Sequence, residues 1–253
     1  MLLFDLSLPT AAENLALDEA LLDSAEKQAA GQTDEQIGGK TAPEELLRLW
    51  ECPQYAAVLG RSGKVVEEVV QAACEAAEVP ILRRTSGGGT VLLGPGCLMY
   101  SLLLSYELRP HLRALDQAHH EVLSTMAAAL NRLLPELNCQ PRGTSDLVSG
   151  NRKFSGNSLR CKRNFLLYHG TLLVDFDLPR ITQLLKPPPR QPDYREQRAH
   201  GEFVMNLPLQ AEKLRKAIAS AWQAVEAAQN WPRELTEHLL KTRYSQPEWN
   251  FER

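Results

Sequence analysis

The sequence lacks any long apolar run. No stretch approaches the roughly 18 consecutive apolar residues that a membrane-spanning helix needs, and the opening residues MLLFDLSLPT contain no basic segment. A secretory signal begins with a positively charged region. We therefore expect neither a membrane protein nor a secreted one.

Paired cysteines and paired histidines are also missing. The five cysteines, at positions 52, 74, 97, 139 and 161, are scattered and form no C-x-x-C pair, and His119 and His120 are adjacent. Adjacent residues face different sides of a helix. This pattern argues against a disulfide framework and against a protein-bound metal, and it is typical of a reducing compartment. We expect a cytoplasmic protein with no metal-ligand set.

There is no excess of basic residues. Lys and Arg number 28 against 31 Asp and Glu, which gives a formal net charge of −3. Nucleic-acid-binding domains are usually strongly basic, so we expect no nucleic-acid partner. The chain has 253 residues, of which 43 % are apolar, enough for the core of one large domain or two small ones.

Several catalytic motifs are absent as well. The chain contains no G-x-x-x-x-G-K-[ST] P-loop, no G-x-G-x-x-G opening a helix and no G-x-S-x-G elbow. These absences exclude a P-loop nucleotide site and weaken a Rossmann interpretation. They also argue against a serine hydrolase of the α/β-hydrolase type.

Apolar periodicity predicts helices and strands without a regular βαβ alternation. Residues 26–45 have no apolar period and are predicted to form an exposed loop. The mixture favours an α+β fold with mixed or antiparallel sheets flanked by helices. Helices are expected at 14–25, 63–77, 111–134, 178–185, 210–227 and 232–241, and strands at 46–50, 55–59, 81–84, 97–105, 145–148, 152–157 and 165–176.

One stretch has an unusual glycine content, RRTSGGGTVLLGPG. Gly87, Gly88 and Gly89 allow the backbone to approach a ligand closely and to direct its N–H groups at it. Arg83 and Arg84 add donors suited to phosphate or carboxylate. The pattern fits an anion site, and it also fits a glycine-rich turn with two solvated arginines.

A second group of polar residues lies about 60 residues further along. Lys153 is predicted on a strand, where its ammonium could enter a cleft or face solvent. Asp146 could accept hydrogen bonds in a turn or fix a basic group nearby. His169, on an apolar strand, is more typical of a structural histidine than of a base.

Eight segments along the chain form an ordered set: "NLALDEALL", "AVLGR", "RRTSGGGTVLLGPG", "GTSDL", "RKFSGNS", "YHGTLLVDFDL", "MNL" and "RYSQPEWNF". In this order they resemble the lipoate–protein ligase A family, whose catalytic fold is shared with biotin–protein ligases and octanoyltransferases. "GTSDL" stands where the family has G-R-N-D-L, with Thr144 and Ser145 replacing Arg and Asn. The similarity covers nearly the whole chain.

The resemblance implies ATP-dependent activation of lipoate, with Mg²⁺, to lipoyl-adenylate and transfer to a lysine of a lipoyl domain. It implies as partners the lipoyl domains of 2-oxoacid dehydrogenase E2 subunits or the glycine cleavage H protein. Lys153 would be the catalytic lysine. The acyl- and nucleotide-binding residues would be Arg84, Gly87, Gly88, Gly89, Thr90, Val91, Leu92, Asp146, Ser155, Gly156, His169 and Gly170.

Two departures from the family leave alternatives open. Residues 1–253 are expected to form a single catalytic domain without the C-terminal accessory domain of longer members, which some relatives supply as a separate chain. Cys139 lies where some octanoyltransferases of this fold carry a thioester-forming nucleophile. This leaves open an octanoyltransferase or lipoyl amidotransferase that takes octanoate from octanoyl-carrier protein and needs no ATP. Thr144 and Ser145 leave room for a lipoate-binding homologue without turnover, unless Arg142 substitutes for the missing arginine.

Overall fold

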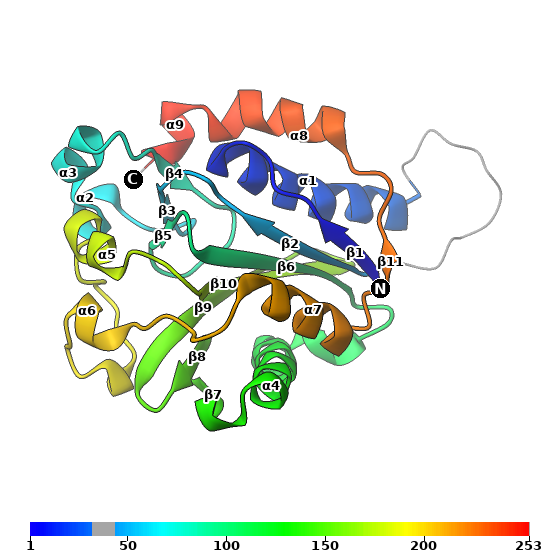
Figure 1. Cartoon of the computed structure of the whole chain (residues 1–253). Helices are drawn as coiled ribbons and strands as arrows, with labels where there is room; N and C mark the ends of the chain where they lie inside the picture. The colour runs from blue at the N-terminus through cyan, green and yellow to red at the C-terminus, as the bar shows by residue number, and fades with distance from the viewer. Residues whose placement is uncertain (32–43, 253) are drawn as a thin grey trace.

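The computed structural model describes residues 1–31 and 44–252, and in this part of the chain two β-sheets are flanked by helices (Figure 1). The larger sheet has the strand order β11-β1-β2-β6-β10-β9-β8-β7. Strands β11, β1 and β2 are mutually parallel, and every later pair is antiparallel. Its strands are β1 (Leu2–Asp5), β2 (Leu46–Glu51), β6 (Cys97–Ser105), β7 (Cys139–Arg142), β8 (Asp146–Ser149), β9 (Arg152–Cys161), β10 (Phe165–Leu173) and β11 (Glu226–Ala227).

A smaller sheet has the order β4-β3-β5, with β3 parallel to β4 and antiparallel to β5. Its strands are β3 (Ala56–Leu59), β4 (Ile81–Arg83) and β5 (Val91–Leu93). The glycine run connects β4 to β5, so it emerges from the carboxyl end of a buried strand. The helices are α1 (Ala11–Ala29), α2 (Val65–Glu68), α3 (Gln71–Ala76), α4 (Leu115–Leu133), α5 (Leu178–Leu184), α6 (His200–Phe203), α7 (Ala211–Ala221), α8 (Arg233–Leu239) and α9 (Pro247–Asn250).

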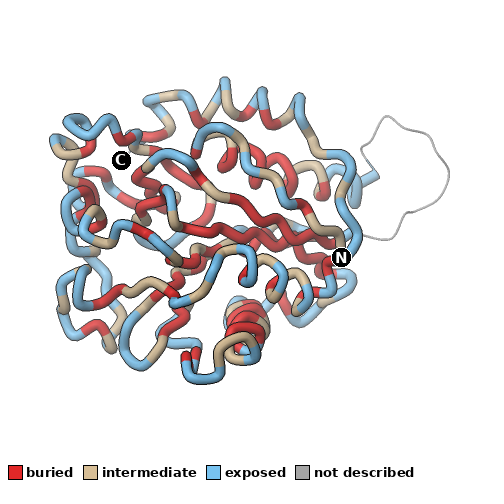
Figure 2. Tube along the Cα trace, in the orientation of Figure 1, coloured by how far each residue is buried: buried red, intermediate tan, exposed pale blue. Residues whose placement is uncertain are grey.

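Apolar layers lie on both faces of the larger sheet, and Figure 2 shows the central strands almost wholly buried. On one face, Leu103 of β6 packs in a cluster with Leu17 and Leu21 of α1. On the other face, Leu102 of β6 packs in a cluster with Val122 of α4. Successive strand residues point to opposite faces, so a nine-residue apolar strand such as β6 requires helices on both sides. The α+β prediction is confirmed.

Helix α1 begins with a reciprocal capping box. The Thr10 hydroxyl accepts from the Glu13 backbone N–H at 3.2 Å, and the Glu13 carboxylate accepts from the Thr10 backbone N–H at 2.7 Å. Such a box satisfies two N–H groups that have no partner inside the helix. It fixes where the helix starts, and so fixes the register in which Asp18 reaches the sheet.

Two of the predicted helices are wrong in part. Residues 63–77 form two short helices because Val69 is extended and forms a β-bridge to Leu185, while the Val70 N–H donates to Leu184 O at 2.9 Å. The helix predicted over 210–227 ends at Ala221, and Glu226–Ala227 pairs with β1 instead. In both cases pairing with a distant segment overrides local propensity.

Short strands were missed at β1, β5, β7 and β11, which have between two and four residues each and therefore too little length for a periodic pattern. The loop predicted at 26–45 is corrected at its start, because α1 continues to Ala29. Its residues 32–43 lie outside the described residues.

No helix among the described residues combines the length and the apolar character needed to cross a membrane.

Candidate functional site

The backbone carbonyl groups of the glycine loop, between β4 and β5, accept hydrogen bonds from other parts of the protein. Gly87 O accepts from the Arg84 guanidinium at 2.6 Å and from the Ser158 hydroxyl at 2.9 Å. Gly89 O accepts from Arg84 at 2.9 Å, and Ser86 O accepts from the Arg61 N–H at 2.8 Å. The orientation of the loop is therefore fixed by groups on its inner side.

The backbone N–H groups of the three consecutive glycines differ from these carbonyl groups. Over the described residues, no hydrogen bond is formed by the backbone N–H of Gly87, Gly88 or Gly89. Gly88 has a φ of +86°, which side chains with a Cβ rarely adopt. Successive unpaired N–H groups in a turn with positive φ form a site suited to an anion.

The two arginines before the loop do not extend into solvent. Arg84 is 7 % exposed, and its guanidinium donates to Val58 O and Ser86 Oγ as well as to the loop. Burial lowers the pKa of Arg84 to about 10, although Glu68 acts in the opposite direction. Arg83 is fully buried and donates to carbonyls of Gly63 and Asn250. The expectation of two ligand-ready donors is thus wrong for Arg83, whose guanidinium joins β4 to α9.

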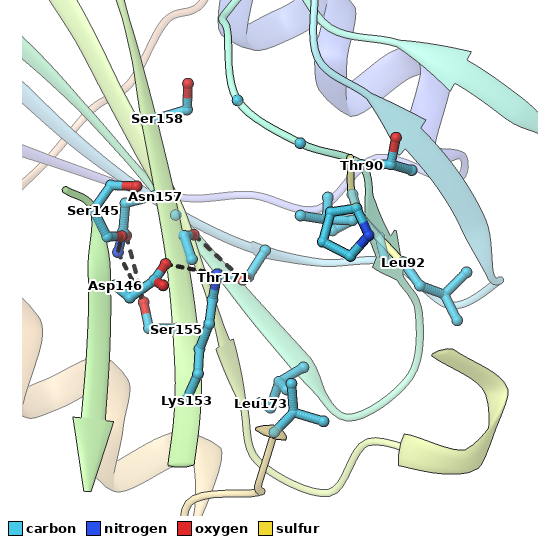
Figure 3. Close-up of a pocket in the computed structure, with 18 of the residues that line it drawn as sticks. Thr90, Leu92, Ser145, Asp146, Lys153, Ser155, Asn157, Ser158, Thr171 and Leu173 are labelled. Carbon is cyan, nitrogen blue, oxygen red and sulfur yellow. Dashed lines mark hydrogen bonds and ion pairs between the residues drawn. The ribbon is translucent and has the colours of Figure 1, made fainter. Parts of the chain in front are cut away.

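Lys153 reaches the cleft from the start of β9. Its ammonium lies 2.6 Å from Asp146 Oδ1, across the β8–β9 pair (Figure 3). A register shift between Leu147 and Val148 interrupts this pair next to the lysine. A Cβ on Gly156 would lie 2.9 Å from the lysine Nζ, so the absence of a side chain there leaves space for the ammonium.

Other elements, among them α1, β2 and β6, complete a cleft of about 460 Å³. Its lining combines apolar side chains, such as Leu15, Trp50 and Met99, with polar groups, such as Lys153 and the glycine loop. The Trp50 indole N–H is buried and has no partner in the described structure. Of the predicted site residues, the cleft is lined by Arg84, Gly88, Gly89, Thr90, Val91, Leu92, Asp146, Lys153, Ser155, Gly156, His169 and Gly170.

His169 is held between the loop and α1. Its Nε2 lies 2.6 Å from Ser86 Oγ, and its Nδ1 lies 3.6 Å from Asp18 Oδ2. Because Ser86 Oγ accepts from Arg84 Nε at 3.0 Å, the Ser86 proton is available to His169 Nε2. The structure thus brings serine, histidine and aspartate together, but Ser86 is 1 % exposed and does not line the cleft. The arrangement fastens the loop to the sheet, and Ser86 is not placed as a nucleophile.

Several residues that position the groups of the cleft were missed by sequence reasoning. Glu68 accepts from the Thr90 N–H at 2.9 Å and from its hydroxyl at 2.8 Å, which fixes the end of the glycine loop. Asp18 holds His169 in position, and the Tyr194 hydroxyl donates a hydrogen bond to Asp146. Each lies far along the chain from its partner. Only Asp18, one of two adjacent acidic residues in "NLALDEALL", had an indication in the sequence, as a charge inside an apolar helix.

Gly87 and Cys139 do not line the cleft. Cys139 is 3 % exposed, lies in the apolar cluster beneath α4, and has both its backbone N–H and its carbonyl bonded to the Asn131 side chain. Burial raises the pKa of the Cys139 thiol to about 12. A thioester nucleophile needs an accessible thiolate, and the structure provides neither access nor a lowered pKa here.

We expect Cys139→Ser to retain most of the ATP-dependent lipoylation that the sequence resemblance implies, at a cost of about 1 kcal/mol in the free energy of unfolding for a hydroxyl in an apolar site. The measurements are intact mass of the modified lipoyl domain and thermal unfolding. The exposed Cys161→Ser is the matched control. A stable octanoyl group on the parental protein, formed from octanoyl-carrier protein and lost in Cys139→Ser, would contradict this assignment.

Comparison with protein families identifies the chain. Residues 10–223 match the model described as the lipoyl protein ligase A/B catalytic domain. The chain belongs to this family. The matched range contains the glycine loop and Lys153 of the cleft described above.

Known family members are similar over different shares of their length. A lipoate–protein ligase 1 from Staphylococcus aureus is 27 % identical over 184 residues, which are 69 % of this chain and 53 % of that protein. A relative in Schizosaccharomyces pombe is 32 % identical over 148 residues, which are 58 % of this chain and 38 % of that one. The matched part of the chain thus spans about half of the first curated relative and well under half of the second.

Solved structures share the fold. A bipartite lipoate–protein ligase from Thermoplasma acidophilum superposes with a TM-score of 0.77 at 22 % identity, over 99 % of this chain and 95 % of that one. A lipoate–protein ligase A with bound ATP gives 0.74 at 22 % identity, over 99 % and 98 %.

The departure from the family's G-R-N-D-L lies at the cleft wall. Thr144 and Ser145 line the cleft, and the Asn157 side chain donates to Ser145 O at 2.8 Å. Arg142 does not line the cleft, because its guanidinium lies over the ring of Tyr194 at 4.8 Å. Arg142 therefore does not stand in for the missing family arginine in this structure.

Proposed function

We propose that this lipoyl protein ligase family member activates lipoate with ATP and transfers the lipoyl group to a lysine of a lipoyl domain. One observation carries the proposal: apolar side chains, an ammonium and unpaired backbone N–H groups line one and the same cleft. The apolar side chains suit an acyl chain, and the ammonium and N–H groups suit a carboxylate and phosphates. The solved relatives with bound ATP and with bound lipoic acid support the same substrate pair.

In the first step a lipoate carboxylate oxygen attacks the α-phosphorus of ATP, and the bond to pyrophosphate breaks. Lys153 stabilises the negative charge that develops on the carbonyl and phosphoryl oxygens. The N–H groups of the glycine loop hold a phosphate. In the second step the target lysine amine attacks the lipoyl carbonyl, and AMP leaves. Activation is needed because a free carboxylate is a poor acyl donor.

Mg²⁺ enters this scheme as the counter-ion of ATP. Within the described part of the chain, no group of three or more His, Cys, Asp or Glu side chains is arranged to hold a metal ion. Three carboxylates, Asp18, Glu68 and Asp146, line the cleft but already accept hydrogen bonds or ion pairs from the protein. The ion would therefore be held chiefly by the phosphates, where it offsets their charge.

The experiment gives the purified protein a lipoyl domain from an E2 subunit or an H protein, with lipoate plus ATP or with octanoyl-carrier protein, and weighs the domain. Lipoylation with release of pyrophosphate is the expected result. Octanoylation without ATP would favour the transferase alternative, and binding of lipoate without either product would favour a homologue without turnover. Because one solved relative is described as bipartite, we propose a separate accessory chain as a possible requirement, and adding that chain forms a second arm.

We expect Gly88→Val to lower the affinity for a non-hydrolysable lipoyl-adenylate analogue by about tenfold or more. A Cβ at this position would lie 3.0 Å from Arg84 Nη2, and the φ of +86° is strained for a β-branched residue. Calorimetry on the folded variant measures the effect. Gly201→Val is the control, because no atom lies within 4 Å of its Cβ position and its φ is not positive. Unchanged binding would mean that the glycine run is only a turn.

A further inference from the structure

Asp146 divides its two carboxylate oxygens between two partners. Oδ1 lies 2.6 Å from the Lys153 ammonium, and Oδ2 accepts a hydrogen bond from the Tyr194 hydroxyl at 2.7 Å. The residue is only 7 % exposed. A buried carboxylate with one donor on each oxygen has little freedom to rotate, so the direction of its contact with the lysine is set partly by the tyrosine.

Packing in turn fixes the Tyr194 ring. The Arg142 guanidinium lies over one side of it at 4.8 Å, and the Phe203 ring centroid is 5.3 Å away. Gly143, with a φ of +59°, lies so close that a Cβ there would be 3.4 Å from both Tyr194 and Pro192. The position of the hydroxyl is thus determined by contacts that involve neither Lys153 nor a ligand.

Tyr194 belongs to a segment that forms part of the cleft wall. Its neighbours Pro192 and Arg195 line the cleft, as do Pro188 and Arg190, whereas Tyr194 itself does not. The hydroxyl therefore approaches Asp146 from behind the wall. Through the hydrogen bond from Tyr194 to Asp146, the position of residues 187–199 therefore influences the position of the Lys153 ammonium.

We propose that Tyr194 is a positioning residue for Lys153 that acts through Asp146, an inference that rests on the proposed function of the same cleft. Without the hydroxyl, Oδ2 loses its donor and the carboxylate rotates so that both oxygens face the ammonium. The ammonium is then drawn toward Asp146 and away from the oxygens on which charge develops. Small misplacements of a catalytic group cost one to two orders of magnitude in rate, so we expect kcat to fall about tenfold.

The test variant is Tyr194→Phe, which keeps the ring and its packing. The matched control is Tyr55→Phe, because the Tyr55 hydroxyl forms no hydrogen bond within the described residues and its ring does not line the cleft. The kinetic measurement is pyrophosphate release with lipoate and ATP. The expected result is a lower kcat with KM nearly unchanged in Tyr194→Phe, and parental values for both parameters in the control.

A second measurement needs no turnover. The rate at which Lys153 is acetylated by an amine-reactive reagent, followed by peptide mass spectrometry, should fall about threefold in Tyr194→Phe because the ion pair with Asp146 strengthens. An unchanged rate overturns the inference. This readout stands even if the parental protein releases no pyrophosphate, a result that would reject the proposed function alone.

A double-mutant cycle separates positioning from a general structural role. In the Asp146→Asn background, Tyr194→Phe should cause no further loss in acetylation rate or in kcat, since the two residues act in series. A loss that persists undiminished in that background would show that Tyr194 acts by another route, and would overturn the inference. Thermal unfolding of all four proteins confirms that they are folded.

Discussion

Replacing Lys153 with alanine should lower the rate of lipoyl transfer by about 100-fold or more, while thermal unfolding stays close to that of the parental protein. The rate falls because an ammonium that stabilises developing negative charge is removed, and the loss of one such donor typically has this size. Stability changes little because the side chain is 27 % exposed and Asp146 keeps its hydrogen bond from Tyr194. Pyrophosphate release and the intact mass of the lipoyl domain measure the effect.

Lys162→Ala is the matched control for this prediction. Lys162 also forms an ion pair with an aspartate, Asp23, and its side chain is 32 % exposed, but it does not line the cleft. We expect this variant to retain activity near the parental level. Transfer by Lys153→Ala at near the parental rate would show that the lysine has been assigned wrongly, whichever acyl donor is used.

The sequence was most informative where one segment contains the whole feature. The glycine run, the lysine strand and the first helix each depend on residues close together in the chain, and the structure places them as expected. The family resemblance adds their order along the chain. The prediction of the glycine loop failed for Gly87, which does not line the cleft, and for Arg83. The orientation of Arg83 was missed because the segment that it contacts, at residues 249–250, lies more than 160 residues away.

The rest depends on contacts between distant residues of ordinary type. Nothing in the vicinity of Tyr194 indicates that its hydroxyl reaches Asp146, 48 residues earlier. The break between α2 and α3 follows from a bridge to Leu185, not from a helix-breaking residue. Cys139 appeared as a candidate nucleophile from its position in the sequence, and only the packing beneath α4 shows that the thiol is buried.

A buried ion pair links the first helix to the centre of the larger sheet. Arg48 of β2 is fully buried, and its guanidinium lies 2.6 Å from Asp18 Oδ1 of α1. Asp18 Oδ2 accepts from Ser101 Oγ of β6 at 2.7 Å and faces His169 of β10. Burial raises the pKa of Asp18, but Arg48, His169 and Ser101 outweigh it, so the pKa lies below its usual value. The carboxylate therefore stays ionised in the lining of the cleft.

Asp18→Asn should lower the free energy of unfolding by about 3–5 kcal/mol, because the amide keeps the shape of the side chain but leaves the Arg48 charge buried without its counter-ion. Denaturant unfolding measures the loss. Asp23→Asn, on the same helix and in a partly exposed pair with Lys162, is the control and should cost at most about 1 kcal/mol. Equal costs for the two variants would mean that the buried pair contributes no more than a surface one.

The Asp18–Arg48 pair also predicts how the stability difference between the parental protein and Asp18→Asn changes with pH. Since the pKa of Asp18 is lowered on folding, its contribution is fully present above the unfolded-state value of about 4 and is lost as the pH falls through the folded-state value. The gap between the parental protein and Asp18→Asn should therefore be constant near neutral pH and narrow in acid. A gap that stays constant down to about pH 3 would show that lost packing, not lost charge, causes the destabilisation.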